Sequence, residues 1–122
     1  MSYQDTMNSL VQNGYISIVT IIDPNGGTYW TNQPEWPVDG PNLLKSWQNK
    51  EPGVNIGGTR FSAVVNDFEG GNFVARNVGG AGIVVIVRAP NNYYFLTWTP
   101  GDVQIPPTNI HAEVSRMASL FR

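Results

Sequence analysis

The chain has 122 residues, a length that fits one domain spanning residues 1–122 around one sheet-centred core. It contains no cysteine, which excludes disulfide bonds, zinc–thiolate sites and thiol nucleophiles. The net charge of -2, with seven scattered Lys and Arg residues, excludes a general attraction to nucleic acid or to anionic membranes.

The first predicted element is a helix that starts after Ser2. A serine at this position can cap a helix, and Asn13-Gly14 is a typical end signal. The residues expected on the apolar face are Tyr3, Met7, Leu10 and Val11. We therefore expect an amphipathic helix between these two signals.

A strand pair and a less regular segment follow. Residues 15–22 are rich in Ile, Val, Thr and Tyr and predict a strand. Residues 23–27 form a strong turn signal, and residues 28–31 predict the returning strand. Prolines scattered over residues 32–58 exclude a long element there, although residues 41–48 can form a short helix that starts with proline.

The sheet pattern resumes after this segment. Strands are predicted over residues 59–65, 72–78, 81–87 and 93–98, and short turns rich in Gly, Pro and Asn separate them. Strands joined by such short turns are antiparallel neighbours, because a parallel pair needs a crossover of about a dozen residues.

The last predicted element is an amphipathic helix, for which Thr108 is the expected cap. Its apolar stripe consists of Ile110, Val114, Met117 and Phe121. The two terminal helices can pair with each other. The predicted fold class is therefore α+β: a central antiparallel sheet of six to seven strands with the N- and C-terminal helices packed on one face.

Catalytic chemistry finds little support in the sequence. His111 is the single histidine, which excludes a pair of imidazole ligands and any network that needs a second histidine. Asp67 and Glu69 lie beside a Gly-Gly turn, where carboxylates usually shape the loop. Residues 79–82 lack the Lys-Ser/Thr of a phosphate-binding loop and lead into a strand. We expect no enzymatic activity, no cofactor and no metal.

The aromatic content favours a binding protein. The chain has four Trp, five Tyr and five Phe residues, and most of these rings are expected in the core. Tyr3 and Trp30 can form an exposed pair if the first helix packs beside the strand that contains Trp30. Exposed aromatic pairs suit proline-rich peptides, whose extended helix docks between rings at low entropic cost.

Five short segments occur in an order that is typical of one family of small proteins. They are Tyr3-Gln4-Asp5 with Leu10-Val11, Ile18-Val19 with Tyr29-Trp30, Gly57-Gly58-Thr59-Arg60-Phe61-Ser62-Ala63-Val64, Gly71-Asn72-Phe73 with Gly79-Gly80-Ala81, and Ser115-Arg116-Met117-Ala118-Ser119-Leu120. Over nearly the whole chain they resemble the profilins, a family of actin-binding proteins. Several loops are shorter than in typical eukaryotic profilins, a pattern that resembles the divergent profilins of archaea, which pair with actin homologues.

The resemblance implies an actin-binding surface on the side of the sheet away from the terminal helices. In profilins this surface comes from the later strands and from the start of the last helix. Carried over by position, the expected contact residues are Arg60, Ser62, Asn72, Arg76, Ile83, Val85, Ile105, Pro106, His111, Ser115 and Arg116. The implied function is actin-monomer binding that regulates filament assembly through sequestration, filament-end control and nucleotide exchange.

The resemblance also implies a site for proline-rich peptides at Tyr3 and Trp30. A second tyrosine of that site in profilins is replaced here by Thr6, and a histidine is replaced by Leu120. Because fewer rings remain, we expect proline-rich peptides to bind weakly or not at all.

Attachment to membranes finds little support. No apolar run approaches the roughly 20 residues that span a bilayer, and the N-terminus has no signal-peptide core. Arg60, Arg76 and Arg116 leave open an interaction with phosphoinositide headgroups, which would be weak because basic charge is sparse. We expect a cytoplasmic, cytoskeleton-associated monomer.

Two other functions fit the same layered architecture. A small-molecule sensor would need an internal pocket of about 300 Å³ or more. Phe73, Phe95, Trp98 and Met117 are expected to fill that space instead. A scaffold that dimerises through an exposed edge strand is the second alternative.

Overall fold

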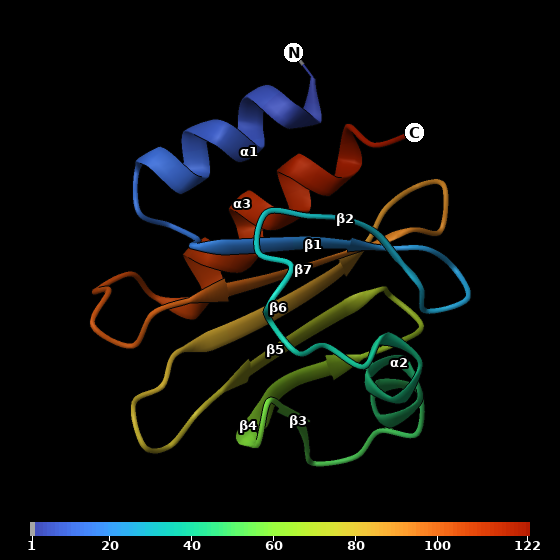
Figure 1. Cartoon of the computed structure of the whole chain (residues 1–122), viewed down its shortest axis with the longest axis vertical. Coiled ribbons are helices and arrows are strands. Elements are labelled where there is room, and N and C mark those ends of the chain that lie inside the picture. Colours follow the sequence, from blue (N-terminus) through green and yellow to red (C-terminus); the bar gives the residue numbers. More distant parts are fainter. Residues whose placement is uncertain (1) are drawn as a thin grey trace.

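The computed structural model describes residues 2–122 and contains a seven-stranded antiparallel sheet (Figure 1). The strands lie in the order β2-β1-β7-β6-β5-β4-β3. Their bounds are Ile18–Ile22 (β1), Thr28–Thr31 (β2), Gly53–Ile56 (β3), Thr59–Asp67 (β4), Asn72–Arg76 (β5), Ile83–Arg88 (β6) and Tyr94–Thr99 (β7). This arrangement confirms the predicted fold class.

One face of the sheet, here called the helix-side face, is covered by the terminal helices. α1 (Tyr3–Gln12) and α3 (Pro107–Ser119) lie side by side on it (Figure 1). Ile110, Val114 and Met117 of α3 are fully buried against the sheet, as their spacing predicts. Within residues 2–122, no helix combines the length and the apolar character needed to cross a bilayer.

The ends of these helices test the predicted caps. The Ser2 hydroxyl accepts a hydrogen bond from the Asp5 N–H at 3.2 Å, which confirms the first cap. The Thr108 cap is wrong: α3 already begins at Pro107, whose fixed φ suits the first helical position, and no side chain caps this end. In α1, Thr6 faces the core in place of Val11, which is 38% exposed.

The opposite face, here called the α2-side face, is also covered. α2 (Gly40–Gln48) packs on it, and Trp47 of this helix is fully buried. The Trp47 ring lies 4.9 Å from the Phe68 ring and 5.7 Å from the Tyr94 ring, between centroids. The expectation of a free face opposite the terminal helices is therefore wrong, because α2 occupies it.

Two apolar layers thus enclose the sheet. Phe73 belongs to the α2-side core, and Phe95 and Met117 belong to the helix-side core. All three are fully buried, as expected from the sequence. Trp98 differs, since it is only partly buried and reaches the surface of the α2-side face.

The segment of residues 32–39, here called the strap, connects β2 to α2. It crosses the α2-side face in front of the sheet (Figure 1). Trp36 and Val38 of the strap pack against the α2-side core. The strap therefore anchors the edge of the sheet through apolar contacts although it lacks regular structure.

Irregular pairing alters the direction of side chains in two strands. In β2, Trp30 lies opposite Ile21 and Thr28 lies opposite Ile22, which leaves Tyr29 as an extra residue. Because a bulge interrupts the alternation of side chains, the consecutive rings of Tyr29 and Trp30 both reach the helix-side face. A similar register shift in β4 falls between Ala63 and Val65.

Candidate protein-binding surfaces

Four of the predicted contact residues lie together on the helix-side face. Ser62 of β4 and Arg76 of β5 are direct cross-strand neighbours, and Arg60 and Asn72 continue the same face of these strands. α3 lies over β6 and β7, so it leaves this part of the sheet open. With His111 and Ser115 of α3, these residues form what we call the sheet–helix surface. It lies beside the terminal helix, not on the far side of the sheet as expected.

A hydrogen bond joins the sheet to the helix within this surface. Asn72 Nδ2 donates to the Gly70 carbonyl oxygen at 3.1 Å, so its Oδ1 accepts from His111 Nε2 at 2.8 Å. Burial lowers the pKa of His111, which favours the neutral ring. Ser115 lies one turn further along α3, and its hydroxyl oxygen is buried without a hydrogen-bond partner in residues 2–122.

The arginines of the strands differ from the arginine of the helix. Arg60 and Arg76 are exposed, and neither forms an ion pair within residues 2–122. Arg116 Nη2 is instead 2.6 Å from Glu113 Oε1 on its own helix. Arg116 comes five positions after His111, which places the two side chains about 140° apart around the helix axis. The structure therefore does not bring Arg116 into the sheet–helix surface.

The apolar residues of the prediction divide into two groups. Ile83 and Ile105 are partly buried against the helix-side core, and Pro106 is exposed just before α3. Val85 is fully buried in that core. The prediction of Val85 as a contact residue is wrong, because its side chain is fully buried in the core beneath the terminal helices and has no surface to offer a partner.

Sequence reasoning missed three exposed valines beside the arginines. Val64 is 57% exposed, Val65 is 40% exposed, and Val78 at the tip of the β5–β6 turn is 85% exposed. The bulge in β4 and the early end of β3, which pairs only with residues 59–62, leave Val64 and Val65 uncovered. A run of valine in a predicted strand normally indicates burial, so no sequence signal marked them.

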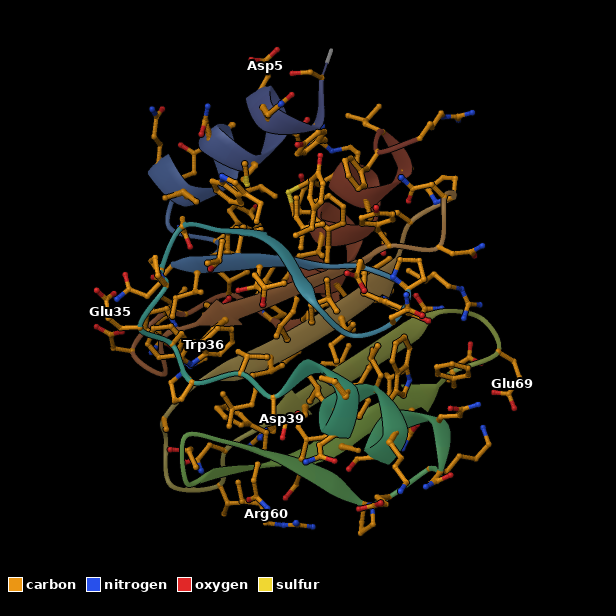
Figure 2. The ribbon with its side chains drawn as sticks, turned by 45° about the vertical axis from the view of Figure 1, so that its right-hand side comes forward. Asp5, Glu35, Trp36, Asp39, Arg60 and Glu69 are labelled. Carbon is orange, nitrogen blue, oxygen red and sulfur yellow. The ribbon has the colours of Figure 1, made fainter. Side chains whose placement is uncertain are left out.

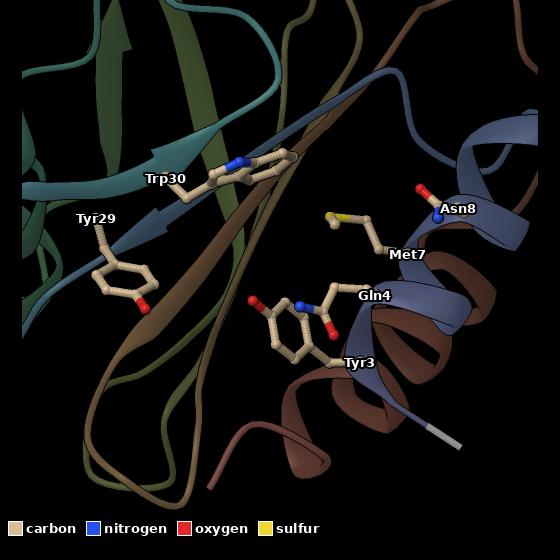
Figure 3. A pocket seen from close by; sticks show the side chains of 6 residues that line it. All are labelled: Tyr3, Gln4, Met7, Asn8, Tyr29 and Trp30. Carbon is tan, nitrogen blue, oxygen red and sulfur yellow. The ribbon is translucent and has the colours of Figure 1, made fainter.

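A groove of about 540 Å³ separates α1 from β2 (Figure 3). Tyr3, Gln4, Met7 and Asn8 line it from the helix, and Tyr29 and Trp30 line it from the strand. Figure 3 shows the Tyr3 and Tyr29 rings on opposite walls. The structure therefore brings together the predicted pair and adds a third ring, which the β2 bulge turns to this side.

Further rings support the floor of this α1–β2 groove. The Phe121 ring lies 4.7 Å from the Tyr3 ring and 6.0 Å from the Tyr29 ring, between centroids. Tyr29 also meets Tyr93 edge-on at 5.3 Å. Burial raises the pKa of Tyr3, and the neighbouring Tyr29 adds to the effect. Contacts among aromatic edges and faces hold the exposed rings in place.

No group of three or more His, Asp or Glu side chains in residues 2–122 is arranged to hold a metal ion. The structure instead has the apolar and basic sheet–helix surface at one end of the sheet and the aromatic α1–β2 groove at the other. The fold and these two surfaces are those of a small protein-binding module.

Comparison with known proteins assigns this module to a family. No family model matches the chain. Odin profilin of Odinarchaeota yellowstonii (strain LCB_4) is 31% identical over 85 residues, which cover 70% of this chain and 68% of that protein. The chain therefore belongs to the profilin family.

Solved structures of other profilins have the same fold. LokiProfilin2, solved in complex with rabbit actin, superposes with a TM-score of 0.76 at 16% identity over 94% of this chain and 91% of that chain. Mouse profilin IIa, solved with a double repeat from the FH1 domain of mDia1, gives a TM-score of 0.66 at 13% identity over 100% of this chain and 97% of that chain.

Proposed function

We propose that this profilin binds the monomer of actin or of an actin homologue and thereby regulates filament assembly. Binding would sequester monomers and control their addition at one filament end, and it would also affect nucleotide exchange. Family membership supports this function, as does the shared fold with LokiProfilin2, which has been solved with rabbit actin.

The observation that carries the proposal is the pair of unpaired arginines on the sheet–helix surface. Arg60 and Arg76 are exposed on adjacent strands and form no ion pair within residues 2–122. Their guanidinium groups are free to form charge-assisted hydrogen bonds with carboxylates of a partner. An acidic surface on actin would be steered toward this end of the sheet by the same charges.

The exposed valines supply the apolar part of the proposed interface. Val64, Val65 and Val78 border the two arginines. Interfaces concentrate their binding energy in a dry apolar centre and place charges toward the rim. A stable interface buries about 800 Å² per partner, so we expect Ile105 and Pro106 at the start of α3 to contribute as well.

The test compares two charge reversals on opposite faces. Arg60→Glu removes a donor from the sheet–helix surface, whereas Lys45→Glu makes the same change on the exposed side of α2. Binding to actin monomers would be measured by pull-down, and filament assembly by a pyrene-actin assay. Arg60→Glu should weaken binding by about 5- to 150-fold, equivalent to about 1–3 kcal/mol, while Lys45→Glu should bind like the wild type.

Three outcomes would contradict the proposed surface. The first is full retention of binding by Arg60→Glu. The second is unfolding of Arg60→Glu at a clearly lower temperature than the wild type, because the Arg60 side chain would then support the fold and would not belong to a free surface. Equal losses from Arg60→Glu and Lys45→Glu would point to a general charge effect and would also contradict the surface.

We further propose that the α1–β2 groove takes a proline-rich segment with weak affinity. Tyr3, Tyr29 and Trp30 line the groove, but Thr6 is buried and supplies no ring. Titration with a proline decamer, followed by tryptophan fluorescence, should give a weak signal that Trp30→Ala removes and Trp36→Phe retains. Tight, saturable binding, or binding that survives Trp30→Ala, would refute this assignment.

Membership of the profilin family also supports the remaining features of the proposed function. We propose that residues 1–122 act as one profilin-like domain, as a cytoplasmic monomer associated with the cytoskeleton, without enzymatic activity. Arg60 and Arg76 offer at most a weak site for phosphoinositide headgroups, because the neighbouring basic charge is sparse. Sedimentation of the free protein would distinguish the monomer from a dimerising scaffold.

A further inference from the structure

A cleft on the α2-side face is lined by two tryptophans that the proposed function does not use. It has a volume of about 460 Å³ and lies between the strap and the adjoining parts of β1 and β7. Its wall is formed by Ile18, Gln33, Glu35, Trp36, Pro37 and Trp98. Glu35 and Trp36 are neighbours on the strap (Figure 2).

The first tryptophan, Trp98, is a fixed wall of this strap cleft. Its indole N–H donates to the Ala81 carbonyl oxygen at 2.9 Å, and its backbone pairs with Ile18 across β1 and β7. Its ring is nevertheless only partly buried. A planar aromatic face is therefore held in position and remains open to solvent on the cleft side.

The second tryptophan, Trp36, is accessible from two flanks. One flank faces the strap cleft, and the other faces a hollow of about 400 Å³ between the strap and the β1–β2 pair. The ring packs partly on the α2-side core. Within residues 2–122 its indole N–H has no hydrogen-bond partner, in contrast to those of Trp98 and Trp47. This donor is available to a ligand.

The charge at the mouth of the cleft is negative. Glu35 is exposed, and its Oε2 accepts a hydrogen bond from Gln33 Nε2 at 3.0 Å. Asp23 and Asp39 use their carboxylates to hold backbone N–H groups of a turn and of the start of α2, whereas Glu35 holds no backbone group in residues 2–122. None of the described residues that line the cleft is basic. Glu35 thus places an uncompensated carboxylate beside two open indole rings.

We propose that the strap cleft binds an arginine side chain of a partner protein. A guanidinium group is planar and weakly hydrated, so it stacks on a tryptophan face more favourably than a lysine ammonium does. Its N–H groups would donate to the Glu35 carboxylate, and the free Trp36 N–H would donate to a backbone carbonyl of the partner. Gln33 orients the carboxylate that receives the arginine.

The strap cleft lies on the opposite face of the sheet from the two other candidate binding surfaces. Trp98 and Trp36 lie on the α2-side face, while the sheet–helix surface and the α1–β2 groove lie on the helix-side face. The sheet separates the two sets of residues. A protein that presents an arginine to the strap cleft would therefore bind without competing for either of the other surfaces.

The test follows the four tryptophan indole N–H signals of the ¹⁵N-labelled full chain by NMR. The probe is the peptide acetyl-Gly-Arg-Gly-amide, and its neutral counterpart carries citrulline in place of arginine. The arginine peptide should shift the Trp36 and Trp98 signals saturably and leave the Trp47 signal unchanged. The citrulline peptide should bind at least about fivefold more weakly, because it keeps the shape of the side chain without the charge.

Glu35→Gln provides the matched variant, with Glu51→Gln as a control at an exposed glutamate outside the cleft. Glu35→Gln should weaken the arginine peptide by about threefold or more, and Glu51→Gln should not change its affinity. The proposal is overturned if no saturable shift appears, if both peptides bind equally, or if the arginine peptide shifts Trp30 in place of Trp36 and Trp98. These readouts do not depend on actin, so the proposed function stands or falls separately.

Discussion

The hydrogen bond between Asn72 and His111 connects β5 to α3 within the sheet–helix surface. Asn72 uses both ends of its side-chain amide, toward His111 at 2.8 Å and toward the Gly70 carbonyl at 3.1 Å. Its own backbone carbonyl accepts from Trp47 Nε1 at 3.2 Å. A partner that used Asn72 or His111 would therefore have to replace bonds that already stabilise the fold.

Loss of these hydrogen bonds should lower the stability of the fold. Asn72→Ala removes two neutral hydrogen bonds, each of which contributes about 0.5–1.5 kcal/mol, so the free energy of unfolding should fall by about 1–3 kcal/mol. His111→Ala removes one of them. Because both single variants delete the same bond, the double variant should be more stable than the sum of the single losses implies, with a coupling of about 0.5–1.5 kcal/mol.

Urea unfolding followed by tryptophan fluorescence would measure all four proteins of this cycle. The buried Trp47 ring next to Asn72 gives the signal. Asn109→Ala, an exposed asparagine on the same helix whose side chain has no hydrogen bond within residues 2–122, is the control and should change stability by less than about 0.5 kcal/mol. A coupling below about 0.3 kcal/mol would show that the bond does not link β5 to α3 in solution.

Three further predictions concern pH, packing and backbone geometry. Because burial lowers the pKa of His111 in the folded state, the unfolded state binds more protons below about pH 6.5, and the free energy of unfolding therefore decreases as the pH is lowered through that range. His111→Gln should reduce this loss of stability in urea unfolding, and an unchanged loss would exclude His111 as its source. Val85→Ala should lower the free energy of unfolding by about 2–3 kcal/mol, since it leaves a cavity in the helix-side core, whereas Val64→Ala on the surface should lower it by less than about 0.5 kcal/mol. Similar denaturation midpoints for the two variants would contradict the assigned burial. Gly82→Ala would place a Cβ against the Thr99 carbonyl oxygen at a φ of +122°, while the Cβ of Gly58→Ala, at a φ of +81°, meets open space. Thermal unfolding should therefore show the Gly82 variant to be less stable than the Gly58 variant by at least about 2 kcal/mol.

The order of the helices and strands other than β3 could be predicted from the sequence because each of them has a local signal. Turn residues separate the strands, and the apolar spacing of α3 indicates its buried face. β3 was missed because its four residues include glycine and asparagine and fall in the segment with weak periodicity. The observed ends of the other strands differ from the predicted ends by at most three residues.

The sequence contains a pattern indicating that both faces of the sheet are covered, and the prediction did not use it. The run Ile83-Val84-Val85-Ile86-Val87 is apolar without alternation, which is typical of a strand buried on both sides. Given that pattern, Val85 had to face one apolar layer or the other. The contact role of Val85 was inferred from its position in the resemblance to profilins, without regard to this pattern. The prediction therefore placed a core residue on the surface.

The candidate surfaces could be predicted only in part, since they depend on register. Arg60, Ser62 and Arg76 alternate regularly and share a face as expected. Tyr29, Val64 and Val65 lie at or beside bulges, and their directions follow from pairing with distant strands. The position of α3 over β6 and β7 also depends on tertiary packing, and it decides which strands remain open.

The extra residue in β2 means that strand length, as well as amino-acid identity, sets how many rings a ligand meets. Deleting one residue from Thr28–Thr31 would restore the two-residue repeat and rotate one of the adjacent rings to the other side of the sheet. The gain or loss of a single codon would then change ligand preference while every aromatic residue is kept. Relatives that share the Tyr-Trp pair need not share its binding properties unless they also share the bulge.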